Sequence, residues 1–152
     1  MTINLADLNA TKPSELVFDL ELLHPVTDEP LGLFIQVLGN NSERVRKLRD
    51  DQINELLKAD FEKQRNKGKA PTFDVVVKKN ARLSARATVG WYELQPVNVG
   101  EKAKKIDGLP FGDTRIEFNE DAAIQLYSDP AYEWLYQQVD KAVGELSNFM
   151  KP

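Results

Sequence analysis

Two stretches near the N-terminus place an apolar side chain at every second position, and this pattern constrains the fold more than any other feature of the chain. In residues 16–23 these side chains are Leu16, Phe18, Leu20 and Leu22. In residues 31–37 they are Leu31, Leu33, Ile35 and Val37. A period of two is typical of a β-strand with one buried face. Because two prolines and an aspartate lie between the stretches, the sequence predicts an antiparallel hairpin within residues 14–40.

The segment after the hairpin changes to a spacing near 3.6 residues, which is the period of an α-helix. Asn41 or Ser42 is the expected N-cap of this helix. Its expected end is Gly68, because glycine favours helix C-termini and Pro71 follows shortly after. The predicted apolar stripe of the helix comprises Val45, Leu48, Ile53, Leu56, Leu57 and Phe61.

Residues 73–89 have two interpretations. The run 73–77 is rich in β-branched residues, which favours a strand. Thr72 could instead cap a helix, and the residues after the valines have good helix propensity. We expect a helix that ends at Gly90.

Residues 91–118 contain three glycines and two prolines at short intervals. We expect an irregular region here, because these residues interrupt regular structure. Asp107-Gly108 is typical of a tight turn, and Ile116 and Phe118 are candidates for a short strand.

The last third of the chain contains two sequence signals for the start of a helix. Asn119 is an expected N-cap, followed by two acidic residues that the helix dipole favours, and Phe118 before it is placed to pack onto Ala123. Asp129-Pro130 predicts the second start, because proline suits the first position of a helix. The apolar stripe expected on this last helix comprises Ala131, Trp134, Leu135, Gln138, Val139, Ala142, Val143 and Leu146.

These elements predict an α+β fold in which an N-terminal hairpin, or a small sheet, packs with about four helices. A length of 152 residues is typical of one domain. Within it we expect a loose arm (1–13), the hairpin (14–40), a helical middle (41–90), an irregular region (91–118) and C-terminal helices (119–149). The aromatic and aliphatic residues expected in the core are Trp91, Phe111, Phe118 and Leu126.

Charge is distributed unevenly, although the net charge is only −4. Residues 42–90 hold thirteen basic and seven acidic residues, whereas the rest of the chain holds seven basic and seventeen acidic ones. A basic segment can bind phosphate groups. The lysines are not regularly interleaved with stacking aromatic side chains, as a binder of single strands would require. We therefore favour solvated helix faces over a nucleic-acid-binding surface.

Catalytic patterns are absent from the sequence. The single histidine, His24, lies beside a proline in the predicted turn, and Asp19 and Glu21 occupy the polar positions of a strand. The chain has no cysteine and no clustered ligands for a metal. No glycine-rich phosphate loop and no activated serine are present. We expect a protein that is not an enzyme and has no cofactor or metal.

Membrane and export signals are also missing. No apolar run reaches the roughly 20 residues that span a bilayer. The N-terminus lacks a basic start followed by an apolar core. We expect a cytoplasmic protein with no membrane partner.

The C-terminal part of the chain carries an ordered series of short motifs: Val89-Gly90-Trp91, Gly108-Leu109-Pro110-Phe111, Phe118-Asn119-Glu120-Asp121-Ala122-Ala123, Leu126-Tyr127, Trp134, Gln138-Val139 and Ser147-Asn148-Phe149. The series resembles the tail assembly chaperones, sometimes labelled minor tail proteins, of long-tailed bacteriophages and prophages. Members tend to have a Gly-Trp pair, a Gly-Pro-Phe turn, a helix after a Phe-Ser/Thr/Asn pair, and an Asn-Phe ending. Residues 94–105 depart from the pattern as an insertion.

The resemblance implies an assembly factor in the cytoplasm of the bacterial host. Such chaperones bind the long helical tape measure protein, keep it soluble, and help to recruit the tail tube protein, and weak self-association is also compatible with this role. They are not retained in the finished virion. The partner surface expected here is either the hairpin face or the last helix, with Trp134, Leu135, Val139 and Val143.

Two other functions stay open from the sequence. One is a structural tail or connector subunit that is retained in the virion. The other is a small nucleic-acid-binding factor that uses the basic segment 42–90. The basic residues considered for phosphate contacts are Lys78, Lys79, Arg82 and Arg86.

Overall fold

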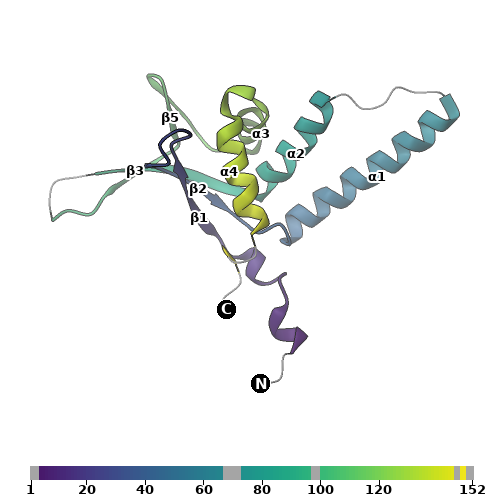
Figure 1. Ribbon diagram of the computed structural model, residues 1–152, viewed down its shortest axis with the longest axis horizontal. Helices are drawn as coiled ribbons and strands as arrows, with labels where there is room; N and C mark the ends of the chain where they lie inside the picture. Colours follow the sequence, from purple (N-terminus) through teal and green to yellow (C-terminus); the bar gives the residue numbers. More distant parts are fainter. Residues whose placement is uncertain (1–3, 67–72, 97–99, 146–147, 150–152) are drawn as a thin grey trace.

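A four-stranded antiparallel sheet and four α-helices form the described part of the chain, which confirms the predicted α+β class (Figure 1). The computed structural model describes residues 4–66, 73–96, 100–145 and 148–149. The strands are β1 (Phe18–Leu23), β2 (Pro30–Val37), β3 (Thr88–Gln95), β4 (Lys104–Asp107), β5 (Leu109–Phe111) and β6 (Thr114–Ile116). The helices are α1 (Glu43–Asn66), α2 (Phe73–Ala87), α3 (Glu120–Ser128) and α4 (Glu133–Gly144), with 3₁₀ helices η1 (Leu5–Leu8), η2 (Pro13–Glu15) and η3 (Pro130–Tyr132).

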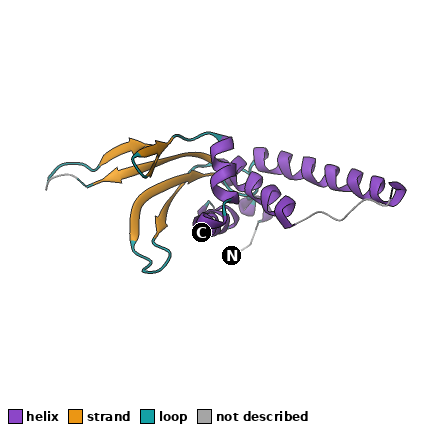
Figure 2. Cartoon of the chain, turned by 90° about the horizontal axis from the view of Figure 1, so that it is seen from above, coloured by secondary structure: helices purple, strands orange, loops and turns teal. Residues whose placement is uncertain are grey.

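The helices and the strands extend from a shared packed region. Helix α4 contacts β1 and β2, and α2 contacts α1, α3 and α4. Seen from above, the strands and α1 extend in opposite directions from the other helices (Figure 2). In both views the C-terminal half of α1 projects beyond the rest of the fold.

The hairpin predicted within residues 14–40 is confirmed. Strands β1 and β2 pair antiparallel, with Phe18 opposite Val37 and Leu20 opposite Ile35. A third strand joins them, because β3 pairs with β2 and places Trp91 opposite Ile35. Strand β4 completes the order β1-β2-β3-β4.

The N-terminus of α1 is capped differently from the prediction. Ser42 occupies the cap position, since its carbonyl accepts the N–H of Arg46. Its hydroxyl, however, is buried and makes no hydrogen bond with the described residues. The N–H of Glu43 instead donates to the carboxylate of Glu15. A side chain from η2 therefore caps the helix, and short-range spacing could not indicate this.

The segment 73–89 is helical as expected, but the predicted end at Gly90 is wrong. Helix α2 ends at Ala87, and Thr88 begins β3. Gly90 lies inside the strand opposite Gln36, and a Cβ on it would approach the Gln36 Oε1 atom to 2.8 Å. Glycine is thus used here for close packing between strands and not for helix termination.

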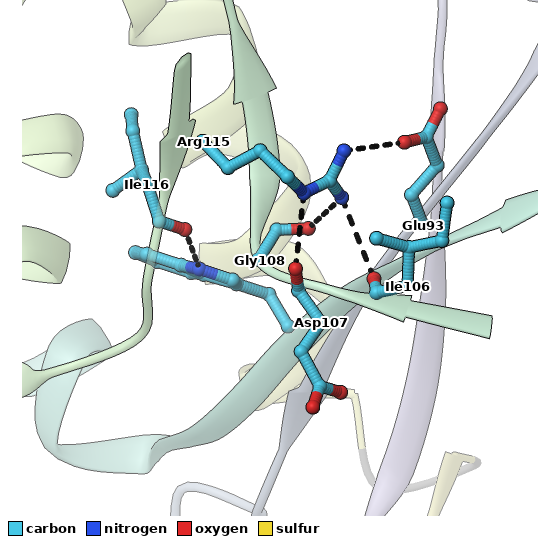
Figure 3. Close-up of polar contacts among 7 residues, drawn as sticks. Glu93, Ile106, Asp107, Gly108, Arg115 and Ile116 are labelled. Atoms are coloured by element: carbon cyan, nitrogen blue, oxygen red, sulfur yellow. Dashed lines mark hydrogen bonds and ion pairs between the residues drawn. The ribbon is translucent and has the colours of Figure 1, made fainter.

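The region 91–118 was expected to be irregular with a short strand at Ile116 and Phe118, but it contains parts of β3 and all of β4, β5 and β6. Strand β6 includes Ile116 and ends before Phe118. The side chain of Arg115 joins several parts of this region through hydrogen bonds and an ion pair (Figure 3). The guanidinium group donates to the carbonyls of Asp107 at 3.0 Å and Gly108 at 2.8 Å, and it pairs with Glu93 at 2.8 Å. Positive φ angles at Gly108 and Gly112, of 89° and 58°, allow the chain to change direction on either side of β5. The tight turn predicted at Asp107-Gly108 is wrong, because Asp107 ends β4 and Gly108 is a bend that leads to β5 in the other sheet. The tight turn lies at Gly112-Asp113, between the paired strands β5 and β6.

Both predicted starts of the C-terminal helices are confirmed. The side chain of Asn119 accepts the N–H of Ala122 at the start of α3. The side chain of Asp129 accepts the N–H of Ala131. Pro130 follows at the first helical position, although the first turn is the 3₁₀ helix η3 and not yet α4.

The core predictions are confirmed except at Phe111. Trp91 and Leu126 are buried. Phe118 is half-buried and packs edge-on against Trp91, with ring centroids 5.1 Å apart. Phe111 is 48% exposed, because it lies next to the turn of the β5–β6 ribbon, where the Tyr132 ring meets it edge-on.

Candidate interaction surface

The residues considered for catalysis have structural contacts. The Nδ1 atom of His24 accepts the N–H groups of Val26 and Thr27 at 3.1 and 3.2 Å, so the imidazole stabilises the turn between β1 and β2. Among the described residues, no group of three or more His, Cys, Asp or Glu side chains could hold a metal ion.

Asp19 also has a structural partner. Its carboxylate accepts a hydrogen bond of 3.0 Å from the hydroxyl of Tyr92. The Tyr92 ring stacks on Phe34, with centroids 5.1 Å apart, and the ammonium group of Lys105 lies 4.4 Å from its centroid. Burial, followed by the hydrogen bond to Asp19, raises the pKa of Tyr92 to about 12. Asp19 thus orients a protonated phenol on the sheet.

The partner surface predicted on the last helix is wrong for most of its residues. Leu135, Val139 and Val143 are buried, because α4 lies against β1, β2, α2 and α3. Trp134 is half-buried against the same core. The apolar stripe of α4 is therefore a core face, and it is not available to a partner in this conformation.

The stripe predicted on α1, by contrast, is buried only at its N-terminal end. Val45 and Leu48 are buried, since α1 contacts α2 there. Further along, the exposed fractions are 48% for Ile53, 43% for Leu56, 61% for Leu57 and 66% for Phe61. These four positions follow the helical period and lie on one face of α1, which is mainly apolar but also carries the exposed Asp60.

The first turns of α2 carry two exposed valines, of which Val76 lines one groove together with Ile53 and Leu56 of α1. Val75 and Val76 are 42% and 45% exposed. We call the six exposed side chains the α1–α2 apolar surface; they are Ile53, Leu56, Leu57, Phe61, Val75 and Val76. Isolated exposed apolar residues are ordinary, but a contiguous set on neighbouring elements is typical of a binding surface.

A groove of about 210 Å³ runs between α1 and α2 at the base of this surface. The side-chain amide of Gln52 donates to the carbonyl of Lys79 at 3.0 Å and joins the two helices there. The groove is lined by Arg49, Gln52, Ile53, Leu56, Val76, Lys79 and Asn80. Its apolar walls and few polar groups are typical of a site for an apolar ligand surface.

A second hollow, of about 280 Å³, borders the groove and shares Arg49 and Asn80 with it. It is polar, and burial raises the pKa of Asp140 and of Tyr136, which both line it. The guanidinium group of Arg49 donates to the carbonyl of Asn40 at 3.0 Å and also to its side-chain oxygen. Arg49 is therefore held in place between the two hollows.

Sequence reasoning identified the apolar face of α1 but did not distinguish it from a core face. The groove residues Gln52, Val76 and Asn80 were missed, because no pattern indicates which helices meet. The basic set considered for phosphate contacts is only partly accessible, since Arg86 pairs with Glu120.

No described helix is long and apolar enough to cross a membrane. Comparisons with models of protein families, with curated proteins and with solved structures find no match to this chain.

Proposed function

We propose that this protein is a tail assembly chaperone of a long-tailed bacteriophage, which binds the tape measure protein in the host cytoplasm and keeps it soluble during tail assembly. The observation that carries the proposal is the α1–α2 apolar surface, which the described part of the chain leaves uncovered. The resemblance of the C-terminal motifs to this family supports the same function.

The physical requirements of this task match the features of the chain. A tape measure protein is a long helix, and an exposed apolar stripe along it promotes aggregation. A second protein prevents this when it covers the stripe with an apolar face of its own, in the helix-in-groove mode of recognition. The projecting half of α1 offers such a face away from the sheet, so a long partner can lie along it without displacing the core (Figure 2).

The sheet is the candidate face for a second partner through the half-buried Phe34 and the exposed Lys105, since Tyr92 between them is buried. Phe34, Tyr92 and Lys105 form a stacked cluster on it, and Asp19 is hydrogen-bonded to the cluster. We propose that the tail tube protein is the second partner, so that the chaperone brings the two tail components together.

Co-expression with the tape measure protein of the same phage tests the proposal. We expect the tape measure protein to stay in the soluble fraction as a complex with several copies of this chain. The complex should survive moderate salt, because apolar contact is screened less than charge contact. A tape measure protein that stays insoluble in the presence of this chain would contradict the proposal.

Mass spectrometry of purified virions tests the structural-subunit alternative. A chaperone leaves the particle, so the chain should be absent from virions or present only in traces. Recovery at a stoichiometric copy number would favour a retained tail or connector subunit instead.

A further inference from the structure

The geometry points to the groove between α1 and α2 as the binding site for an amphipathic helix whose apolar stripe is flanked by acidic residues. This inference rests on the proposed function, because it specifies the chemistry of the helix that the chaperone recognises. It adds a location, a charge preference and a contact residue that can be tested separately.

The apolar part of the site is built for a helix. Ile53, Leu56 and Val76 form the apolar lining of the groove, and Leu57 and Phe61 continue the face along α1. A helix that lies along α1 can insert residues spaced three and four apart between these side chains. The exposed face follows α1 for more than two turns, so it matches an extended helical ligand better than a small molecule.

The groove itself carries charges of one sign, whereas Asp60 lies further along the exposed face of α1. Arg49 and Lys79 are the charged residues among those that line the groove, and no carboxylate lines it. In the part of the chain that the structure describes, neither cation forms an ion pair within 4.0 Å. Carboxylates on both flanks of an apolar stripe would give these cations partners, and such complementarity favours the correct ligand over others.

Two polar side chains of the site are already held in position before a ligand binds. Gln52 ties α1 to the α2 backbone at Lys79, and Asn40 holds the guanidinium group of Arg49. A ligand therefore does not have to order these groups, and this lowers the entropic cost of binding.

A second copy of the chain fits this groove less well. A two-fold symmetric contact presents the same patch on both sides. It would therefore bring Arg49 and Lys79 of both copies into one interface without carboxylates from the groove. Carboxylates for these cations would have to come from outside the groove, from Asp50 or Asp60 of α1, whereas a separate acidic helix supplies them directly.

Two synthetic helical peptides of ~20 residues provide the probes. They share one apolar stripe, flanked by glutamates in the first peptide and by lysines in the second. By fluorescence anisotropy at about 50 mM salt, we expect the glutamate peptide to bind roughly three- to tenfold more tightly, and the difference to shrink at high salt. Equal affinities for the two peptides would overturn the charge preference.

Substitutions in the groove test whether the peptides bind there. Leu56→Asp places a carboxylate in the groove and should weaken binding of both peptides. Lys79→Glu should weaken only the glutamate peptide. The matched controls are Val26→Asp, at an exposed apolar residue in the β1–β2 turn, and Lys104→Glu, at an exposed lysine of β4; both should bind like the parent. Unchanged binding by Leu56→Asp, with an unchanged melting temperature, would overturn the location.

The same variants separate this inference from the proposed function. If Leu56→Asp still keeps the tape measure protein soluble on co-expression, the function stands and the groove is the wrong site. If the parent fails in that experiment, the function is wrong, whereas the peptide measurements still decide the groove. Light scattering tests whether a second copy of the chain occupies the groove. The groove would be a self-association site if the parent is a dimer, if Leu56→Asp converts it to a monomer, and if the peptide does not dissociate it.

Discussion

Trp91 links three parts of the fold through one side chain. Its indole N–H donates to the carbonyl of Ile116 at 2.9 Å, which ties β3 to the β5–β6 ribbon. Its ring meets Phe118 edge-on, next to the start of α3, and its backbone pairs with Ile35 in β2. A buried indole needs such a hydrogen-bond partner, and its large surface contributes strongly to stability.

We predict that Trp91→Ala destabilises the fold by about 3–5 kcal/mol, the usual cost of removing a large buried aromatic side chain. Phe118→Ala should cost less, because Phe118 is only half-buried. Urea denaturation of the parent and both variants measures the two free energies of unfolding. An equal or larger loss for Phe118→Ala would show that the two rings have been ranked wrongly.

Tyr127 gives the fold a dependence on alkaline pH. Thr88 donates its hydroxyl proton to the Ser84 carbonyl, so the Tyr127 hydroxyl is the donor in its 2.8 Å hydrogen bond with Thr88. Burial raises the pKa of Tyr127 well above the ordinary value of 10.0. As the pH rises, the unfolded state therefore releases this proton before the folded state does. The contribution of Tyr127 to the free energy of unfolding is complete below pH 10 and is lost as the pH rises above this value.

Tyr127→Phe should therefore lower the free energy of unfolding by about 0.5–1.5 kcal/mol near neutral pH, the net value of one hydrogen bond. Above about pH 10 the variant should lose stability less steeply than the parent, because it has one fewer tyrosine that resists ionisation. Unfolding free energies measured at several pH values test both statements. Parallel pH profiles for the parent and the variant would contradict the proton linkage.

At the scale of elements, α4 protects the edge of the sheet. Strand β1 is an edge strand, and its backbone could pair with another chain. The side-chain amide of Gln138 on α4 accepts the N–H of Leu23 and donates to its carbonyl, both at 2.9 Å. One amide therefore takes the place that a neighbouring strand would have at this residue.

Replacing that amide should loosen α4 from the hairpin. We predict that Gln138→Ala costs about 1–2 kcal/mol, because two hydrogen bonds are lost. The neighbouring Gln137 is exposed and serves as the control, since Gln137→Ala should leave the stability nearly unchanged. Thermal melting compares the two variants, and similar melting temperatures would show that Gln138 does not join α4 to β1.

At the scale of the whole molecule, α1 is anchored at one end. Its N-terminal turns pack through Val45 and Leu48, Ile53 and Leu56 line the groove beside α2, and the C-terminal half of the helix projects from the fold (Figure 1). An isolated helix is marginal in water, and most helix stability comes from tertiary packing. The projecting half therefore depends on a partner for full stability.

Hydrogen–deuterium exchange measures this difference. We predict fast amide exchange in residues 54–61 and slow exchange in residues 45–49 of the free protein. Binding of the glutamate-flanked peptide should slow the exchange in 54–61. Uniform protection along α1 in the free protein would contradict this prediction.

Sequence by itself determined the elements whose signals are local. Alternation of apolar residues identified the hairpin, and the caps at Asn119 and Asp129 identified where the C-terminal helices begin. A strand period or a cap involves residues only a few positions apart, so it can be recognised without knowledge of the fold. The resemblance to tail assembly chaperones also came from such short motifs, and the function that it implies stays a prediction.

Tertiary structure alone decided which apolar faces are covered. The stripes of α1 and α4 look alike in sequence, yet Val139 is buried and Leu57 is exposed. The same applies at Gly90, where α2 ends at Ala87 and the chain continues as β3, paired with β2, before the glycine is reached. Periodicity shows that a helix has an apolar side. Burial depends on contacts between residues far apart in the chain, and the sequence does not specify these locally.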